Sequence, residues 1–403
     1  MNAIDPDALV ATVQEAADSA THHGGRPRIL FLIRTFGRGG AQRQLVVLAS
    51  GLQRAGWEVS AACFYAGDAF ERELTQANVQ VIDLGKRGRW DVVGFGWRLW
   101  RTLRQQDADI VHGYLTVGNL LALLARLAHW HTRVVWGVRS AYMDRSRYDW
   151  MARATFRLSC HLARLADLII VNSQAGAEHH AALGYPRGRI RVVANGIDTH
   201  RFRFDADGRA RVREEWSIPD AAVLVGLVGR IDPMKDHGTF LRAAAELARR
   251  DARWLFACVG EGHTDYAAAL RSEADALGLA GRLIWTGARQ DMPAVYSAFD
   301  LAASTSYGEG FPNVIAEAMA CGRRCVVTDV GDSARIVGNC GVVVPPHSPV
   351  AVADALEALW CATGGLPAAA AARTRIVACY SVPALLTSTQ ATLRNLRGVR
   401  RYT

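Results

Sequence analysis

The stretch AAVLVGLVGRIDPMKDHGTF, residues 221–240, joins an apolar run to a polar, glycine-containing loop and the start of an amphipathic segment. A short run that is apolar at nearly every position is typical of a parallel strand buried on both faces. RILFLIRTFGRGGAQRQ, residues 28–44, has the same layout near the start of the chain. A strand–loop–helix unit at two distant places predicts two α/β domains in a chain long enough for both.

More apolar runs of strand length follow each stretch, with longer amphipathic runs between them. A Gly- and Asp-rich stretch, NGIDTHRFRFDADG (195–208), separates two groups of runs and predicts a linker. The first group lies at 28–34, 59–65, 79–84, 109–113, 133–138, 167–172 and 190–195. The second lies at 221–230, 252–260, 282–287, 300–305, 324–329 and 341–346.

We therefore expect an α/β fold of two Rossmann-like, doubly wound domains that face each other across a cleft. The first domain would span 28–198 and the second 199–380. A helical segment within 381–403 would cross back to the first domain. The carboxyl ends of both sheets would line the cleft, which is where ligands bind in this architecture.

Composition excludes several classes of protein. No apolar run reaches the ~18 residues that a membrane span needs, and residues 1–27 lack the apolar core of a signal peptide, so we expect a flexible leader on a cytoplasmic protein. The eight cysteines contain no CxxC pair and no zinc spacing, as in reduced core residues. Through Asp198 the chain has 24 Lys and Arg against 17 Asp and Glu, which indicates either an anionic partner or a solvated basic face.

The loop FGRGGAQRQ (36–44) follows the first strand run and opens a helix. Glycines there let the backbone approach a ligand, and the amides of a helix N-terminus attract anions. The spacing of Gly37, Gly39 and Gly40 does not match the dinucleotide fingerprint G-x-G-x-x-G. The loop therefore predicts either an anion contact or an ordinary structural turn.

Two cations follow the first strand run of the second domain. Arg230 stands at the end of the run, and Lys235 lies five positions later, near the next helix start. Only Lys86 and Lys235 are lysines in this arginine-rich chain, so a lysine here indicates a need for a compact point charge. The pair predicts a diphosphate site, with a solvated helix start as the alternative.

The stretch GEGFPNVIAEAMACG (308–322) places two glutamates around a predicted helix start. Pro312 suits the first helical position, and Gly322 suits the C-cap. Glu317 would lie on the same helix face as Asn313 and lean toward the turn that holds Glu309. Two carboxylates alone are few for a metal site. An acid–base pair is possible, but carboxylates also accept hydrogen bonds from neutral hydroxyls, and acids beside cations match a nucleotide sugar.

These motifs together resemble those of the retaining glycosyltransferases of family 4, which have the GT-B fold. The similarity covers about 28–365 and rests on GGAQRQ, NGID, VGRIDPMKDH, EGFPNVIAE and TDVGDSARIVG, in which the two glutamates fit the E-x7-E motif. The resemblance implies a nucleotide-sugar donor, no divalent metal, no PLP and no other cofactor. It also implies front-face attack, in which the leaving phosphate serves as the base.

The resemblance further implies roles for individual residues. Arg230 and Lys235 would hold the diphosphate, Glu309 would contact the transferred sugar, and Glu317 would bind the ribose. The loop of Gly39 and Gly40 would close over the phosphates, and Arg289 would form a wall of the base site. Backbone amides lining the sugar and phosphate site would come from Phe311, Asn313 and Val314.

One position departs from the family pattern. Many members have a histidine near the sugar after the fifth strand, and Arg139 occupies that position here. Arginine is not a base at neutral pH but can hold a phosphate or an acceptor anion. His112, at the end of the fourth strand run, would face the cleft by position, with a structural histidine as the alternative. Both are candidates for the acceptor or sugar site.

The acceptor side gives a weaker signal. Residues 86–106 carry Trp97, Arg101 and Arg104 near one helical face. This pattern is typical of an anionic membrane surface, or of a core helix with its arginines in water. The first alternative predicts a peripheral protein with a glycan or polyprenyl-linked acceptor, as in surface polysaccharide assembly such as that of lipopolysaccharide. We expect no nucleic acid partner.

The leading hypothesis is a transferase that moves a hexose or N-acetylhexosamine from a UDP- or GDP-sugar. A sugar-nucleotide epimerase of similar fold would need in-cleft carboxylates and a histidine to move a proton, and no acceptor. A catalytically silent sugar-nucleotide-binding partner of another transferase is the third alternative, and Arg139 favours it. Phosphorylase chemistry would need a PLP lysine in the second domain, where Lys235 is already assigned to phosphate.

Overall fold

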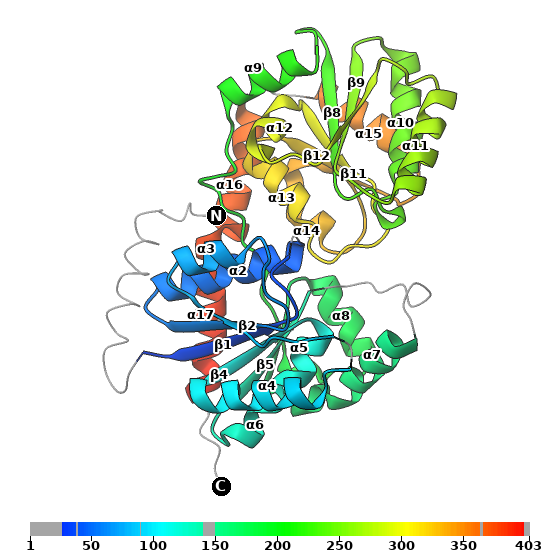
Figure 1. The fold of residues 1–403 in the computed structure, drawn as a ribbon. Coiled ribbons are helices and arrows are strands. Elements are labelled where there is room, and N and C mark those ends of the chain that lie inside the picture. The colour runs from blue at the N-terminus through cyan, green and yellow to red at the C-terminus, as the bar shows by residue number, and fades with distance from the viewer. Residues whose placement is uncertain (1–25, 38, 89, 140–149, 363–365, 399–403) are drawn as a thin grey trace.

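A computed structural model describes residues 26–37, 39–88, 90–139, 150–362 and 366–398, in two lobes stacked one above the other (Figure 1). Among these residues, every strand of both sheets pairs in parallel. The predicted leader, 1–27, falls almost wholly outside the described residues.

The first sheet has the strand order β3-β2-β1-β4-β5-β6-β7 within the described residues. Its strands are β1 (Arg28–Ile33), β2 (Glu58–Cys63), β3 (Gln80–Asp83), β4 (Ile110–Tyr114), β5 (Arg133–Val138), β6 (Leu168–Val171) and β7 (Ile190–Val192). Its helices are α2 (Gly40–Arg54), α3 (Glu71–Gln76), α4 (Val93–Gln106), α5 (Leu115–Ala122), α6 (Ala125–Ala128), α7 (Trp150–Leu162) and α8 (Gln174–Ala182).

The second sheet has the order β10-β9-β8-β11-β12-β13 within the described residues. Its strands are β8 (Val223–Val228), β9 (Trp254–Val259), β10 (Leu283–Gly287), β11 (Leu301–Ser304), β12 (Arg324–Thr328) and β13 (Val342–Val344). Its helices are α9 (Ala206–Glu215), α10 (His237–Arg250), α11 (Thr264–Ala276), α12 (Met292–Ala298), α13 (Asn313–Ala320), α14 (Ser333–Val337), α15 (Pro349–Cys361) and α16 (Leu366–Tyr380).

Each sheet has an apolar core on both faces, which explains why its strands are apolar at successive positions. In β1, Ile29 and Phe31 contribute to the core shared with α2, whereas Leu30 and Leu32 contribute to the core shared with α4. Every predicted run contains a strand, and the predicted ends differ from the observed ones by three residues at most. The α/β fold of two Rossmann-like domains is therefore confirmed.

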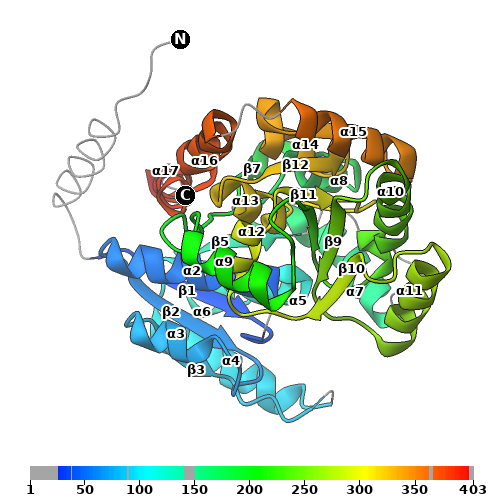
Figure 2. The ribbon, with the colours of Figure 1, turned by 90° about the horizontal axis from the view of Figure 1, so that it is seen from above.

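The chain returns to the first domain at its C-terminal end, as predicted. Ile197 of the linker pairs with Ser381, which lies between α16 and α17 (Val382–Gly398). Leu385 and Leu393 of α17 are buried in the core of the first domain. Figures 1 and 2 both show α17 beside the first sheet, so two neighbouring segments of chain connect the domains. No helix in the described ranges is both long enough and apolar enough to span a bilayer.

Candidate active site

Helix α13 begins beside the first of the two glutamates. Pro312 precedes its first residue, Asn313, in an extended conformation with φ −75° and ψ 94°. Pro312 is therefore the N-cap rather than the first helical residue that we predicted. Gly322 lies just beyond the C-cap Cys321 rather than at it, and its φ of +76° suits glycine in that position. Because α13 follows β11, its N-terminus opens at the carboxyl edge of the second sheet.

The turn that carries Glu309 is supported by the loop after β12. A Cβ atom on Gly331 would lie 2.6 Å from the carbonyl oxygens of both Glu309 and Gly310. Gly331 also has a φ of +57°, so a side chain there would be strained as well as crowded. The amide of Asp332 donates to the carbonyl of Gly310 at 2.9 Å. This segment, part of TDVGDSARIVG, therefore sets the position of Glu309.

The carboxylate of Asp332 reaches the first domain. Its Oδ2 accepts from the amide of Gln174 at 2.9 Å, and its Oδ1 accepts from the amide of Ala175 at 3.1 Å. These amides belong to the first turn of α8, where a negative charge is favourable. The sequence analysis missed this link, although a Gly-Asp pair after a strand could have signalled a capping residue.

Lys235 and Glu309, predicted to contact different parts of the donor, are direct partners. Lys235 Nζ lies 2.5 Å from Glu309 Oε1, which also accepts from Ser306 Oγ at 2.8 Å. Both charged side chains are mostly buried, with 19% and 10% of their surface exposed. Glu309 therefore has its oxygen Oε1 occupied, and Lys235 is held where the β8 loop meets the turn before α13.

Arg230 is placed differently from Lys235. Its side chain is 70% exposed and lies 3.7 Å from Asp232. A weak surface contact of this kind contributes little to stability. Arg230 is thus at the edge of the β8 loop, free to reorient toward an anion, while Lys235 is fixed at its centre.

Glu317 lies in the second turn of α13, eight positions after Glu309 in the loop before the helix. Tyr296 of α12 donates a hydrogen bond to its Oε2 at 2.8 Å. Burial of the carboxyl raises the pKa of Glu317 to about 7, against the opposing effects of Tyr296, Arg201 and Arg43. Once ionised, a carboxyl with this pKa is a strong hydrogen-bond acceptor. A hydroxyl or a cation that binds beside it would favour the ionised form and lower its pKa.

We expect Glu317→Gln to flatten the pH dependence of stability. Between about pH 4.5 and 7 the folded protein keeps a proton on Glu317 that the unfolded chain has lost. The free energy of unfolding of the parent should therefore fall as pH rises through this range and level off above it. Urea unfolding of both proteins at several pH values measures this, and parallel curves would contradict the raised pKa.

The glycine loop of the first domain lies opposite the start of α13. Gly39 is the N-cap of α2, and a Cβ atom on Gly40 would lie 3.6 Å from Asn313 Nδ2. The N-termini of α2 and α13 thus approach the same space from the two domains. Their free amides make this space suitable for an anion such as a diphosphate. Residue 38 lies outside the described residues.

A chain of polar side chains runs from Arg139 to α13. Arg139 donates to the hydroxyl of Tyr114 at 2.5 Å and to Asn195 Oδ1 at 3.2 Å. Asn195 in turn donates to Asn313 Oδ1 at 2.8 Å. Arg139 therefore links the end of β5 through the NGID motif to the mouth of α13. Asn195 was not among the predicted site residues, although it is the first residue of that motif.

His112 does not face the cleft, contrary to its predicted position. It has no exposed surface, and its ring lies 5.3 Å from that of Phe31 and 4.9 Å from that of Tyr114, measured between centroids. Burial, together with the nearby charge of Arg139, holds the pKa of His112 well below its usual range. The structural alternative therefore describes His112 better, because neighbouring strands cover it.

The remaining predicted donor residues are Arg289, Phe311 and Val314. Arg289 is held by Glu215 at 2.5 Å and by Asp291 at 2.9 Å. Phe311 is buried, and its ring lies 5.4 Å from that of Tyr380 at the crossing to α17. Val314 is partly exposed in the first turn of α13. Each of these side chains except Val314 therefore has a defined partner within the protein.

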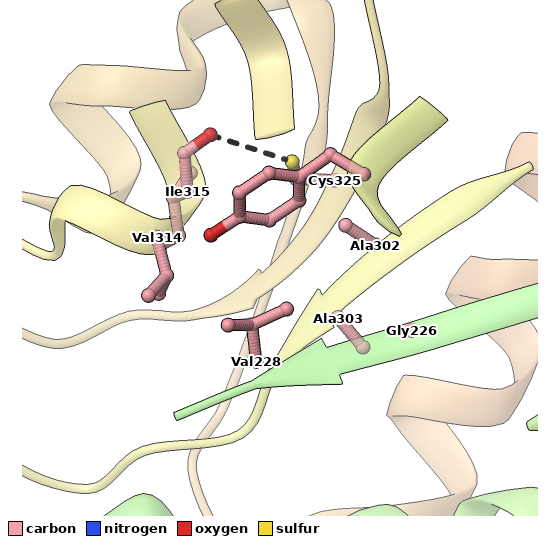
Figure 3. A pocket seen from close by; sticks show the side chains of 8 residues that line it. Gly226, Val228, Ala302, Ala303, Val314, Ile315 and Cys325 are labelled. Atoms are coloured by element: carbon pink, nitrogen blue, oxygen red, sulfur yellow. Dashed lines mark hydrogen bonds between the residues drawn. The ribbon is translucent and has the colours of Figure 1, made fainter. Parts of the chain in front are cut away.

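A small apolar cavity of about 10 Å³ lies beneath α13 (Figure 3). Val314 and Ile315 line it from the helix, and Val228, Ala302 and Cys325 line it from the sheet. A volume of this size holds one water at most. The cavity is a packing defect in the second domain and is too small to hold a substrate.

Two family models match the chain over most of its length. The one described as Glycosyltransferase Family 4 matches residues 38–201, and the one described as Glycosyl transferases group 1 matches residues 222–361. The chain belongs to the family 4 glycosyltransferases. The chain has the GT-B fold, and the family predicted from the motifs is confirmed.

Curated relatives of this chain include enzymes named D-inositol 3-phosphate glycosyltransferase. The one from Salinispora tropica is 36% identical over 42% of this chain and 39% of its own length. The one from Corynebacterium glutamicum is 32% identical over 62% of this chain and 63% of its own length. The chain spans about half the length of most of the curated relatives that it matches.

Solved structures with the same fold cover almost the whole chain. HepE of Anabaena in complex with UDP has a TM-score of 0.80 at 22% identity, over 91% of this chain and all of that one. Sucrose-phosphate synthase of Thermosynechococcus elongatus has a TM-score of 0.77 at 19% identity, over 92% of this chain and 99% of that one. At these identities the likeness shows the fold alone.

Proposed function

We propose that the protein transfers a hexose or N-acetylhexosamine from a UDP- or GDP-sugar to an acceptor hydroxyl, with retention of configuration and without a metal. The observation that carries the proposal is the Lys235–Glu309 pair, which lies in the loops just ahead of α13, where Gly40 at the start of α2 approaches Asn313 from the other domain. Family membership and the UDP complex of the HepE neighbour support a nucleotide-sugar donor.

In this proposal the Lys235–Glu309 pair opens when the donor binds. The diphosphate takes Lys235 as its cation, and Arg230 turns in from the surface to the same anion. The amides beside Phe311, Asn313 and Val314 and the loop of Gly39 and Gly40 contact the phosphates and the sugar. Glu309, released from the lysine, accepts hydrogen bonds from the sugar hydroxyls.

Two further residues would fix the nucleoside. Glu317 would accept from the ribose hydroxyls, and Arg289, held in place by its two carboxylate partners, would stack beside the base. Glu317 is held by Tyr296 and Arg289 by Glu215 and Asp291, and such partners restrict the side chains and reduce the entropy that binding would cost. Arg139 would stay a link between the domains and could hold an anionic acceptor at the same time.

The reaction breaks the bond between the anomeric carbon and the phosphate oxygen. The acceptor oxygen attacks on the face from which the phosphate leaves, and its proton passes to a phosphate oxygen. Lys235 and the helix N-termini stabilise the charge that builds up on the leaving diphosphate. No protein base is required, in keeping with arginine at position 139.

For the acceptor we propose a glycan or a polyprenyl-linked sugar in surface polysaccharide assembly. Support comes from α4, where Trp97 is 58% exposed and Arg101 lies over its ring at 5.6 Å. Arg104 lies over Trp100 in the same way at 5.2 Å, while Leu99 and Leu103 are buried beneath. One face of α4 thus belongs to the core, and the other carries aromatic and cationic groups that suit an anionic membrane surface.

A phosphorylated cyclitol is the competing acceptor, because the curated relatives are named for inositol 3-phosphate. Arg139 and the basic first half of the chain are also compatible with a small phosphorylated acceptor. A turnover assay with both acceptor classes therefore distinguishes the two proposals, since the membrane acceptor needs lipid and the cyclitol does not.

A thermal-shift screen of UDP- and GDP-sugars is the first test, because a bound donor stabilises the fold by mass action. The hit is then incubated with each acceptor class and, separately, without acceptor. Transfer with an α-linked product from an α-linked donor supports the proposal. An epimerised donor formed without acceptor would favour the epimerase, and tight binding with no turnover on any acceptor would favour the silent partner.

We expect a chelator to leave turnover unchanged. The positive groups around the proposed diphosphate site are Lys235, Arg230 and two helix N-termini, so phosphate charge is neutralised by the protein. Initial rates with and without EDTA, at a temperature well below unfolding, measure this. A loss of activity that is restored by Mg²⁺ or Mn²⁺ would contradict the proposal of a metal-free reaction.

A further inference from the structure

A cluster of two histidines and one aspartate lies at the amino edge of the first sheet, the edge opposite the cleft. Asp107 is the C-cap of α4, His129 is the C-cap of α6, and His131 lies two positions later, before β5. His129 Nδ1 lies 3.5 Å from Asp107 Oδ1, and His131 Nε2 lies 3.3 Å from the same oxygen. One candidate ligand atom from each residue thus lies within 4.8 Å of the others.

The two distances that involve Asp107 are compatible with a tetrahedral metal centre. Zinc bonds of 2.0–2.1 Å to nitrogen and oxygen, at tetrahedral angles, place neighbouring ligand atoms about 3.3 Å apart. The two distances from Asp107 agree with this value to within a few tenths of an ångström. Two imidazoles with a carboxylate form a donor set that zinc accepts readily, and a water can complete the coordination.

Hydrogen bonds orient two of the three ligands. His129 Nε2 lies 3.1 Å from the carbonyl oxygen of Arg104, which can only accept, so this nitrogen carries the hydrogen. Nδ1 is then the ring nitrogen that faces the Asp107 carboxylate, on the side where a shared cation would lie. Asp107 Oδ2 is held by Arg28 at 3.0 Å, which leaves Oδ1 for the cluster. Partners of this kind are typical of metal-binding side chains.

The two backbone segments that carry the cluster are also fixed relative to each other. Thr132 Oγ1 donates to the carbonyl of Ala108 at 2.9 Å, and the amide of Arg133 donates to the carbonyl of Asp109 at 2.9 Å. The ligands therefore do not have to be brought together by the ion. All three side chains keep some exposed surface, from 22% for His129 to 43% for His131, so an ion can enter from solvent.

We propose that Asp107, His129 and His131 bind a zinc ion that joins the end of α4 to the segment before β5. The ion is structural: it lies at the edge of the sheet away from the proposed donor site. Its binding would raise the thermal stability of the first domain and leave the turnover of folded protein unchanged.

Calorimetric titration of the untagged full chain with Zn²⁺ tests the proposal, with melting temperature as a second readout. His131→Ala and Asp107→Asn should each lower the affinity at least about 10-fold and remove the stabilisation. Asparagine tolerates the left-handed conformation of Asp107, so this variant should fold. His161→Ala, which removes an exposed histidine on α7, should bind as the parent does, and Mg²⁺ should not bind.

The double variant His129→Ala/His131→Ala decides the outcome. His22 and His23 are a second pair of neighbouring histidines, and both are present in the parent and in every variant. Any zinc that they bind therefore adds equally to each measured stoichiometry. One zinc fewer per chain in the double variant than in the parent supports the site. Equal stoichiometry and affinity in the two proteins would overturn it and leave the cluster as ion pairs only.

Discussion

Glu309→Gln is expected to lower turnover by about 10- to 150-fold while the protein still binds the nucleoside diphosphate. A hydrogen bond to a charged group contributes about 1.5–3 kcal/mol, and glutamine replaces the charged acceptor with a neutral one of the same size. Ser306, which donates to Glu309 at 2.8 Å, can donate to the glutamine carbonyl as well, so the turn should persist. Initial rates at saturating donor measure the effect.

The pairing of Glu309 with Lys235 sharpens this experiment. In the parent, the Glu309 carboxylate competes with the diphosphate for Lys235. Without this carboxylate, the affinity for UDP or GDP should be kept or increased. Glu273→Gln is a matched control, because Glu273 forms a comparable 2.5 Å ion pair with Arg242 outside the site. Near-parental turnover in Glu309→Gln, or an equal fall in nucleotide affinity, would contradict a role for Glu309 toward the sugar.

Lys235→Ala is expected to weaken nucleoside diphosphate binding by about 10- to 150-fold, the equivalent of one charge-assisted contact of 1.5–3 kcal/mol. The variant also leaves the mostly buried Glu309 without its cation, so the diphosphate would approach a bare carboxylate. Lys86→Ala is the control, because Lys86 is the other lysine of the chain and contacts Asp91 and the Phe95 ring instead. Calorimetric titration with UDP and GDP measures the affinities.

The double variant Lys235→Ala/Glu309→Gln separates the attraction of the diphosphate by Lys235 from its repulsion by Glu309. If Lys235 contacts the diphosphate and Glu309 repels it, adding Glu309→Gln should recover part of the affinity that Lys235→Ala loses. Neighbouring charges give such non-additive effects, whereas independent sites give additive ones. Unchanged affinity in Lys235→Ala would remove the central cation from the proposed donor site.

Much of the fold could be predicted because buried parallel strands have a simple pattern. Leu30 and Phe31 face opposite cores, so both must be apolar, and the same holds along each strand. The loops after the first strand of each domain were also recognisable from their glycines and cations. Sequence reasoning therefore placed Gly40, Lys235 and Glu309 at the carboxyl edges of the two sheets.

The contacts inside the site could not be predicted, because they join residues far apart in the chain. The partners Lys235 and Glu309 are 74 positions apart, and Asp332 and Gln174 are 158 apart. His112 shows a second limit: a residue near the end of a strand can turn either to the cleft or to the neighbouring strands. The packing of Phe31 and Tyr114 decided this, and neither carries a chemical motif.

The link from Asp332 to α8 means that the first turn of this helix, in the first domain, depends on a carboxylate of the second domain. The hydroxyl of Ser173, the N-cap of α8, accepts from the amide of Gly176, whereas the amides of Gln174 and Ala175 donate to the carboxylate of Asp332 in the second domain. If the domains moved apart, these two amides would lose their acceptor and become open to solvent. Their hydrogen exchange would then report how often such a separation occurs, and a ligand that held the domains together would slow it.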